Sequence, residues 1–238
     1  MPNQHVPWRD AWERALYGEG GFFRTSRPVD HFRTSAHVGL FAEAVAELAR
    51  RTSAPTVVDV AAGGGELLAA LDGLLPGVDL VGVEIADRPA GLPDRITWRH
   101  DLPERVDGVL IANEWLDNIP CAVVEVGEDH VVHEVRVDPA TGEEAPGDVH
   151  DSAWLRSWWS LDEPGMRAED GATRDAAWAD AVSRVSGTAI AIDYGHLRDD
   201  RPAFGSLRSY SDGHEVDVRP DGSRDVTAHV AVDAVAAA

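Results

Sequence analysis

The residues best suited to chemistry lie in one short stretch, where a carboxylate precedes a glycine-rich turn. Residues 56–60 (TVVDV) are a mostly β-branched run that predicts a buried strand, and this run contains Asp59. Ala61, Gly63 and Gly65 follow, and an apolar helical pattern then resumes. A strand, a turn without large side chains and a helix start leave backbone N–H groups open to a ligand. The stretch therefore predicts a site for a nucleotide-type ligand.

The spacing of the glycines distinguishes two kinds of nucleotide ligand. Dinucleotide sites use G-x-G-x-x-G, and Leu68 stands where the third glycine of that pattern would be. The run D-x-A-x-G-x-G is similar to the first motif of class I S-adenosylmethionine-dependent methyltransferases, [DE]-x-G-x-G-x-G, from which Ala61 departs. An ordinary βα turn is the alternative, because short glycine patterns are common.

A second carboxylate strengthens the prediction of a ribose-containing ligand. The apolar run 78–84 predicts a strand that ends in Glu84, 19 residues after Gly65. A carboxylate at this position can accept hydrogen bonds from both ribose hydroxyls, which NAD and S-adenosylmethionine share. The alternative for Glu84 is a solvated carboxylate at a strand end.

A third strand is expected at 96–100, followed by Asp101. A carboxylate there can accept a hydrogen bond from an exocyclic amine such as the adenine N6. The alternative is an Asp turn before Pro103.

Polar groups also follow the fourth and fifth expected strands, 108–112 and 189–192. Ligands of open α/β sheets bind beyond the carboxyl ends of the strands, where both polar segments fall. The candidate catalytic side chains are those of Asn113, Glu114, Asp117 and Asp193. If the first segment is helical, Glu114 and Asp117 share a face; the alternative is a capping cluster at a strand–helix junction.

Composition restricts the partners. The chain has 238 residues and a net charge of −21, which disfavours nucleic acid and suits a cationic ligand or a basic protein segment. All 21 basic residues are arginine, so P-loop and Schiff-base lysines are excluded. The single Cys121 fits a reducing cytoplasm. We expect no bound metal and no membrane association, and the oligomeric state is left open.

We expect four parts along the chain. Residues 1–55 form a helical and lid segment, and residues 56–120 form the Rossmann-like core. Residues 121–186 form an insertion with a hairpin at 121–137, a mobile loop at 138–151 and tryptophan-rich helices. Residues 187–238 complete the core sheet, with a last readable strand at 225–230.

Motifs in order along the chain resemble one family. GFF, HFRTS, DVAAGGGEL, NEWLDNIP, IDYGH, GSLRSY and DVTAHV are similar to segments of the MidA family, which includes the mitochondrial complex I assembly methyltransferase. The resemblance runs from about Gly20 to the C-terminus. Ala61-Ala62 departs from the Gly-Pro of the family, and the chain stops where the family continues into a further helix and a last strand. A truncated sequence would explain that stop.

The resemblance implies a cofactor, a fold and a substrate class. S-adenosyl-L-methionine would bind near Thr34 and Ser35 and be held by Gly63, Gly65 and Glu84. Asn113, Glu114 and Asp117 would face the methyl group.

The expected fold is α/β: a Rossmann-like, doubly wound, mostly parallel sheet with helices on both faces and a hairpin and helical insertion. If the sequence is truncated, the C-terminal strand of the sheet is missing. The expected activity is methyl transfer to a protein side chain, with arginine favoured. The alternatives are a non-catalytic binding or assembly module on the same fold, and an NAD-dependent oxidoreductase.

Overall fold

The computed structural model describes residues 5–25, 39–211 and 213–238, so the predictions for Thr34 and Ser35 lie outside the described residues. The chain forms two compact units. The parallel-sheet unit comprises Phe23–Leu116 and Asp180–Asp193. The mixed unit comprises Met1–Phe22, Asp117–Ala179 and Tyr194–Ala238. Each of the expected N-terminal, insertion and C-terminal parts contributes residues to both units.

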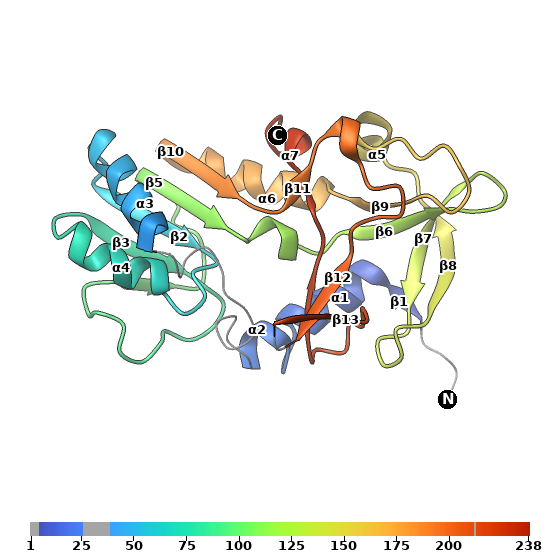
Figure 1. Cartoon of the computed structure of the whole chain (residues 1–238), viewed down its shortest axis with the longest axis horizontal. Helices are drawn as coiled ribbons and strands as arrows, with labels where there is room; N and C mark the ends of the chain where they lie inside the picture. The colour runs from blue at the N-terminus through green and yellow to red at the C-terminus, as the bar shows by residue number, and fades with distance from the viewer. Residues whose placement is uncertain (1–4, 26–38, 212) are drawn as a thin grey trace. The chain divides into compact units, whose positions relative to one another are not determined.

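Five parallel strands form the sheet of the first unit, in the order β10-β5-β2-β3-β4 (Figure 1). This order reverses direction at β2, as in a doubly wound nucleotide-binding sheet. All five strands fall where the apolar runs of the sequence predict them. The strands are β2 (Thr56–Val60), β3 (Asp79–Val83), β4 (Thr97–Arg99), β5 (Val106–Asn113) and β10 (Val185–Ile192).

Two helices of this unit pack on one face of the sheet. They are α3 (Gly39–Arg51) and α4 (Glu66–Leu74). Their apolar positions recur at helical spacing, so each helix presents one stripe to the sheet. The core between these helices and the sheet includes the following small and branched side chains: Ala42, Val45, Ala46, Ala49, Val57, Leu67, Leu68, Leu71, Leu80, Val109 and Ile111. Coverage of the other face by helices stays a prediction.

Trp98 fills the space above β3. A Cβ on Gly82 would lie 2.6 Å from Cε3 of Trp98 and 3.0 Å from Cδ1 of Leu68. The indole N–H of Trp98 donates to the carbonyl of Ala86 at 3.0 Å. The ring therefore needs a glycine beneath it, and it ties β4 to the segment that follows β3.

The mixed unit is built on an antiparallel sheet in the order β1-β7-β6-β9, with β8 beside β7 (Figure 1). The predicted hairpin is confirmed by the pairing of β6 with β7. Helix α1 begins at Trp8 and ends before Gly18, within the N-terminal segment expected to contain helix. The elements are β1 (Val6–Pro7), α1 (Trp8–Tyr17), β6 (Ala122–Val126), β7 (Val132–Val137), β8 (Glu144–Val149), α5 (Ala153–Trp158) and β9 (Arg167–Asp170).

Short elements complete the chain. Helices α2 (Phe22–Thr25) and α6 (Ala172–Ser183) each have residues in both units. The described C-terminal part of the mixed unit consists of short strands, a 3-10 turn and a helix. These are β11 (Gly195–His196), a 3-10 turn (Arg198–Asp200), β12 (Arg208–Ser211), β13 (His214–Val216), β14 (Asp225–Thr227), β15 (Val230–Ala231) and α7 (Val232–Val235). No helix in the described ranges has the length and apolarity needed to cross a membrane.

Two expectations about irregular segments are corrected. The stretch 138–151 contains strand β8, because its backbone pairs with β7 although its composition is polar. Glu114 and Asp117 do not share a helical face: Glu114 has a φ of +53°, and only a 3-10 turn, Leu116–Asn118, follows it.

The chain end also differs from expectation. Strand β14 pairs antiparallel with β12 in a separate three-stranded sheet, and β15 pairs parallel with β11. Among the described residues of the segment 187–238, those in the five-stranded sheet are residues 187–192 of β10. Sequence cannot assign a short strand to one of several sheets, because its pattern carries no information on its partner.

The contact between Trp98 and Gly82 yields a stability prediction. Gly82→Ala should lower the free energy of unfolding by about 1–3 kcal/mol, because the new methyl group overpacks the ring. Gly73→Ala is the control, because Gly73 lies in α4 and an added Cβ there has nothing within 4 Å. This variant should raise the free energy of unfolding by about 0.5–1 kcal/mol. Urea denaturation measures both, and equal stability of the two variants would contradict the packing argument.

Candidate cofactor and active site

The glycine-rich turn joins β2 to α4 through left-handed backbone. Ala61, Gly63 and Gly65 have φ angles of +56°, +54° and +78°. Gly65 is the N-cap of α4 and supplies no side-chain cap. Backbone N–H groups at the helix start can therefore point at a ligand, and the helix dipole favours electronegative atoms there.

Ala61 shows what the departure from the glycine pattern costs. A left-handed conformation costs a residue with a Cβ about 1–2 kcal/mol relative to the right-handed one. The turn nevertheless keeps the left-handed geometry. The substitution therefore adds local strain without changing the path of the backbone.

Glu84 follows β3 and binds the glycine turn. Its Oε2 accepts a hydrogen bond from the Gly63 N–H at 3.0 Å, and its Oε1 accepts from Ile85 and Ala86 at 2.7 and 3.2 Å. Burial raises the pKa of Glu84, against the lowering effect of these amide donors. The carboxylate thus lies beside the turn, as its position in the sequence predicts.

Asp59 is buried in β2 near this carboxylate. Burial raises its pKa to about 8, and the neighbouring charges of Glu84 and Glu66 add to the effect. Asp59 therefore carries a proton at neutral pH. Repulsion between carboxylates at the turn is reduced accordingly.

These groups fit an adenosine-type ligand. The start of α4 offers N–H donors, and Glu84 offers carboxylate oxygens that can accept hydrogen bonds from ribose hydroxyls. Asp101 is exposed and lies two residues beyond the end of β4. Its predicted contact with adenine stays a prediction.

The carboxyl ends of β5 and β10 bring three of the predicted catalytic residues together. Asn113 and Ile192 are paired in register. The N–H of Glu114 donates to the carbonyl of Ile192 at 2.8 Å, and the N–H of Leu116 donates to Oδ2 of Asp193 at 2.9 Å. Asp193 therefore holds the backbone that carries Glu114.

Asp117 belongs to the mixed unit. Its side chain is buried, and its Oδ2 accepts from the hydroxyl of Thr227 at 2.7 Å. Burial raises the pKa of Asp117, while Thr227 and the charge of Arg174 oppose the rise. These contacts indicate that Asp117 joins two segments of its own unit, and its predicted catalytic role stays a prediction.

Three residues near these sites carry no sequence signal that identifies them. An added Cβ on Gly64 would collide with Oε1 of Glu66, so the Glu66 carboxylate covers that glycine. Trp98 lies against Gly65 and Gly82. Arg174 is buried and donates to three carbonyl oxygens of the mixed unit.

Within the part of the chain that is described, no group of three or more His, Cys, Asp or Glu side chains could hold a metal ion.

A parallel sheet with a glycine-rich first turn and a carboxylate after its second strand defines a Rossmann-like nucleotide-binding protein. The family model described as "Putative S-adenosyl-L-methionine-dependent methyltransferase" matches residues 66–238, and the chain belongs to this family. The match begins just after the glycine turn. Membership confirms S-adenosylmethionine as the expected cofactor and disfavours the NAD alternative.

Two solved structures from Burkholderia thailandensis share the fold. One is described as a "likely methyl transferase" bound to S-adenosyl-homocysteine; it has a TM-score of 0.80 and 25% identity, over 97% of this chain and 70% of that chain. The other, an uncharacterized protein, has a TM-score of 0.76 and 24% identity, over 98% of this chain and 70% of that chain, and supports the fold alone. No curated protein matches the chain.

The raised pKa of Asp59 predicts a pH dependence of stability. Its stabilising contribution is full below its ordinary pKa of 3.8 and is lost as the pH rises to about 8, because the unfolded chain releases the proton first. At about 1.4 kcal/mol per pKa unit, the loss amounts to a few kcal/mol. Asp59→Asn should remove this dependence and be more stable than the wild type at pH 8.

Urea denaturation at pH 5 and pH 8 measures this difference. Asp79→Asn, at the exposed start of β3, is the matched control and should keep the wild-type dependence. Identical pH dependence in Asp59→Asn and the wild type would show that Asp59 is ionised in the folded protein.

Proposed function

We propose that this protein transfers a methyl group from S-adenosylmethionine to a protein side chain, an arginine within a basic segment. The observation that carries the proposal is the position of Glu114, held at the carboxyl ends of β5 and β10 on the edge to which the glycine turn belongs. Membership of the methyltransferase family supports the reaction type. The resemblance to the MidA family and the net charge of −21 support the substrate class.

The cofactor would be held by the turn and by Glu84. Gly63 and Gly65 provide backbone that approaches a ligand closely, and Glu84 provides acceptors for ribose hydroxyls. S-adenosylmethionine, when bound, supplies a methyl group activated by a sulfonium. The protein then contributes alignment and electrostatic stabilisation.

Glu114 would orient the acceptor and take up its proton. A guanidinium has a pKa above about 12, so its nitrogen becomes nucleophilic only as a proton leaves. As the nitrogen bonds to the methyl carbon and the carbon–sulfur bond breaks, the proton passes to the carboxylate. Asp193 positions the loop through the N–H of Leu116 and need not touch the substrate itself.

Removing the Glu84 carboxylate should weaken cofactor binding. Glu84→Ala should reduce the affinity for S-adenosylhomocysteine by about 1–3 kcal/mol, roughly 5- to 150-fold, because it removes an acceptor of two hydroxyls. Glu84→Gln keeps one acceptor oxygen and should lose less. Calorimetry on all three proteins provides the test, and binding of NAD without binding of S-adenosylhomocysteine would refute the assignment.

Glu114→Gln separates a catalytic role from a structural one. If Glu114 accepts the proton, the variant should keep its melting temperature and cofactor affinity, while methyl transfer falls on the order of 10²-fold or more. Glu104→Gln, on the exposed loop before β5, should behave as the wild type.

Labelled S-adenosylmethionine and cell lysate supply the transfer assay, and melting is measured on the same preparations. A destabilised Glu114→Gln variant with unchanged activity per folded molecule would refute the catalytic role. Absence of any transfer by the wild type would favour a binding module. Labelling confined to nucleic acid or small metabolites would exclude a protein substrate.

A further inference from the structure

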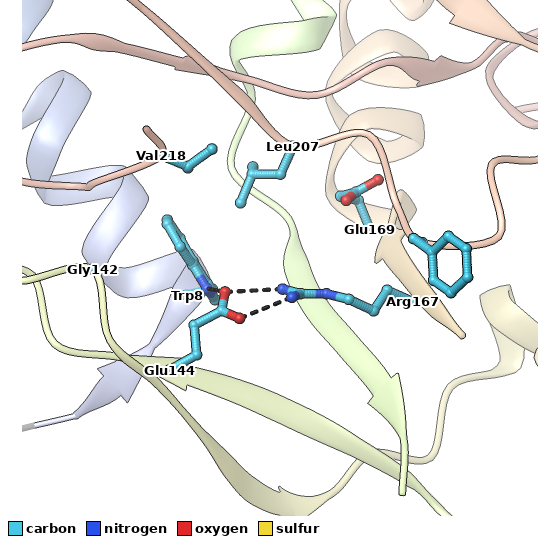
Figure 2. Close-up of a pocket in the computed structure, with 8 residues that line it drawn as sticks. Trp8, Gly142, Glu144, Arg167, Glu169, Leu207 and Val218 are labelled. Atoms are coloured by element: carbon cyan, nitrogen blue, oxygen red, sulfur yellow. Dashed lines mark hydrogen bonds and ion pairs between the residues drawn. The ribbon is translucent and has the colours of Figure 1, made fainter. Parts of the chain in front are cut away.

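A cavity of about 350 Å³ lies within the mixed unit, separate from the residues assigned to the cofactor (Figure 2). It is formed where several segments of that unit meet. The lining residues are Trp8, Gly142, Glu144, Arg167, Glu169, Phe204, Leu207 and Val218.

The charged side chains of the cavity are held in place by one another and by backbone. Arg167 donates from both terminal nitrogens to the two oxygens of Glu144, at 2.8 and 2.9 Å, as the dashed lines in Figure 2 show. The indole N–H of Trp8 donates to the same carboxylate at 2.5 Å. Glu169 is 2% exposed and accepts from the backbone N–H and the hydroxyl of Ser206.

This arrangement leaves acceptor capacity and negative charge in the cavity. Each carboxylate has roughly four lone-pair sites. Among the described residues, three donors bind Glu144, and two bind Glu169, since the one N–H of Ser206 is shared between its two oxygens. Two carboxylates and one guanidinium leave one net negative charge. An anion would meet two carboxylates, while the guanidinium that could attract it is already paired with Glu144.

The apolar part of the lining suits a long side chain with a charged head. Trp8, Leu207 and Val218 provide apolar surface for a methylene stem. Phe204 is 77% exposed, so its ring is available to stack on a cation. An arginine matches these features best, since its planar head both stacks and donates several hydrogen bonds.

We propose that this cavity binds a basic side chain, preferably arginine, of the protein substrate at a position other than the one that is methylated. This inference rests on the proposed function in one respect: the proposed function identifies the partner as the protein substrate. Binding of the side chain itself is a property of the mixed unit and can be measured without the cofactor.

The probe is a short uncharged peptide with one central arginine, compared with the same peptide carrying the neutral isostere citrulline. Calorimetry at low salt should detect binding of the arginine peptide, weakening as salt is added, and no binding of the citrulline peptide. Equal binding of the two peptides, or binding of neither, would overturn the proposal.

Two variants locate the binding. Val218→Trp should fill the cavity and lower the affinity for the arginine peptide at least tenfold. Phe204→Ala should lower this affinity severalfold. Val149→Trp, at an exposed position of β8, is the matched control and should bind as the wild type. Thermal melting shows whether each variant folds. If Val218→Trp does not fold, Phe204→Ala still tests the proposal.

The cavity variants also distinguish the cavity from the proposed active site. Arginine-peptide binding that persists unchanged in both Val218→Trp and Phe204→Ala would place the peptide elsewhere and overturn the proposal. S-adenosylhomocysteine titrated into the same preparations tests the proposed function separately. If S-adenosylhomocysteine does not bind but the arginine peptide does, the methyltransferase assignment is refuted. If S-adenosylhomocysteine binds but the arginine peptide does not, the proposed cavity site is refuted.

Discussion

The hydrogen bond from the Gly63 N–H to the Glu84 carboxylate is the contact on which the ligand edge of the parallel sheet depends. It joins the turn after β2 to the end of β3, beside the bond from the Ala62 N–H to the Val83 carbonyl. The same carboxylate helps to raise the pKa of the buried Asp59. Glu84 thus binds the backbone of the turn and adds to the effect of burial, which is the main cause of the raised pKa of Asp59.

In the mixed unit, the buried guanidinium of Arg174 joins two segments that are far apart in the sequence. Arg174 donates to the carbonyls of Asp117, Ile119 and His229 at 2.8, 3.3 and 2.9 Å. The guanidinium therefore links the segment after β5 to the segment after β14, and the bond from Thr227 to Asp117 reinforces the link. This contact gives a physical reason for the motifs NEWLDNIP and DVTAHV to occur together in one chain.

Carboxylates that look equivalent in the sequence do different work. Asp193 accepts a backbone N–H and orients a loop, whereas Asp117 accepts a hydroxyl in the interior of the mixed unit. Glu114 stands at a left-handed turn directly after β5. A backbone conformation that costs energy is retained where the surrounding structure enforces it, and such positions are frequent at functional sites.

The sequence alone determined the parallel sheet, the glycine turn and the place of Glu84. These features follow from local patterns: apolar runs of strand length, glycines where the turn is left-handed, and a carboxylate at a strand end. It did not determine that Glu114 and Asp117 lie in different units, that the polar stretch 138–151 forms β8, or that β14 leaves the main sheet. Those outcomes depend on partners far apart in the chain, such as Thr227 for Asp117 and β7 for β8, and only tertiary packing brings such partners together.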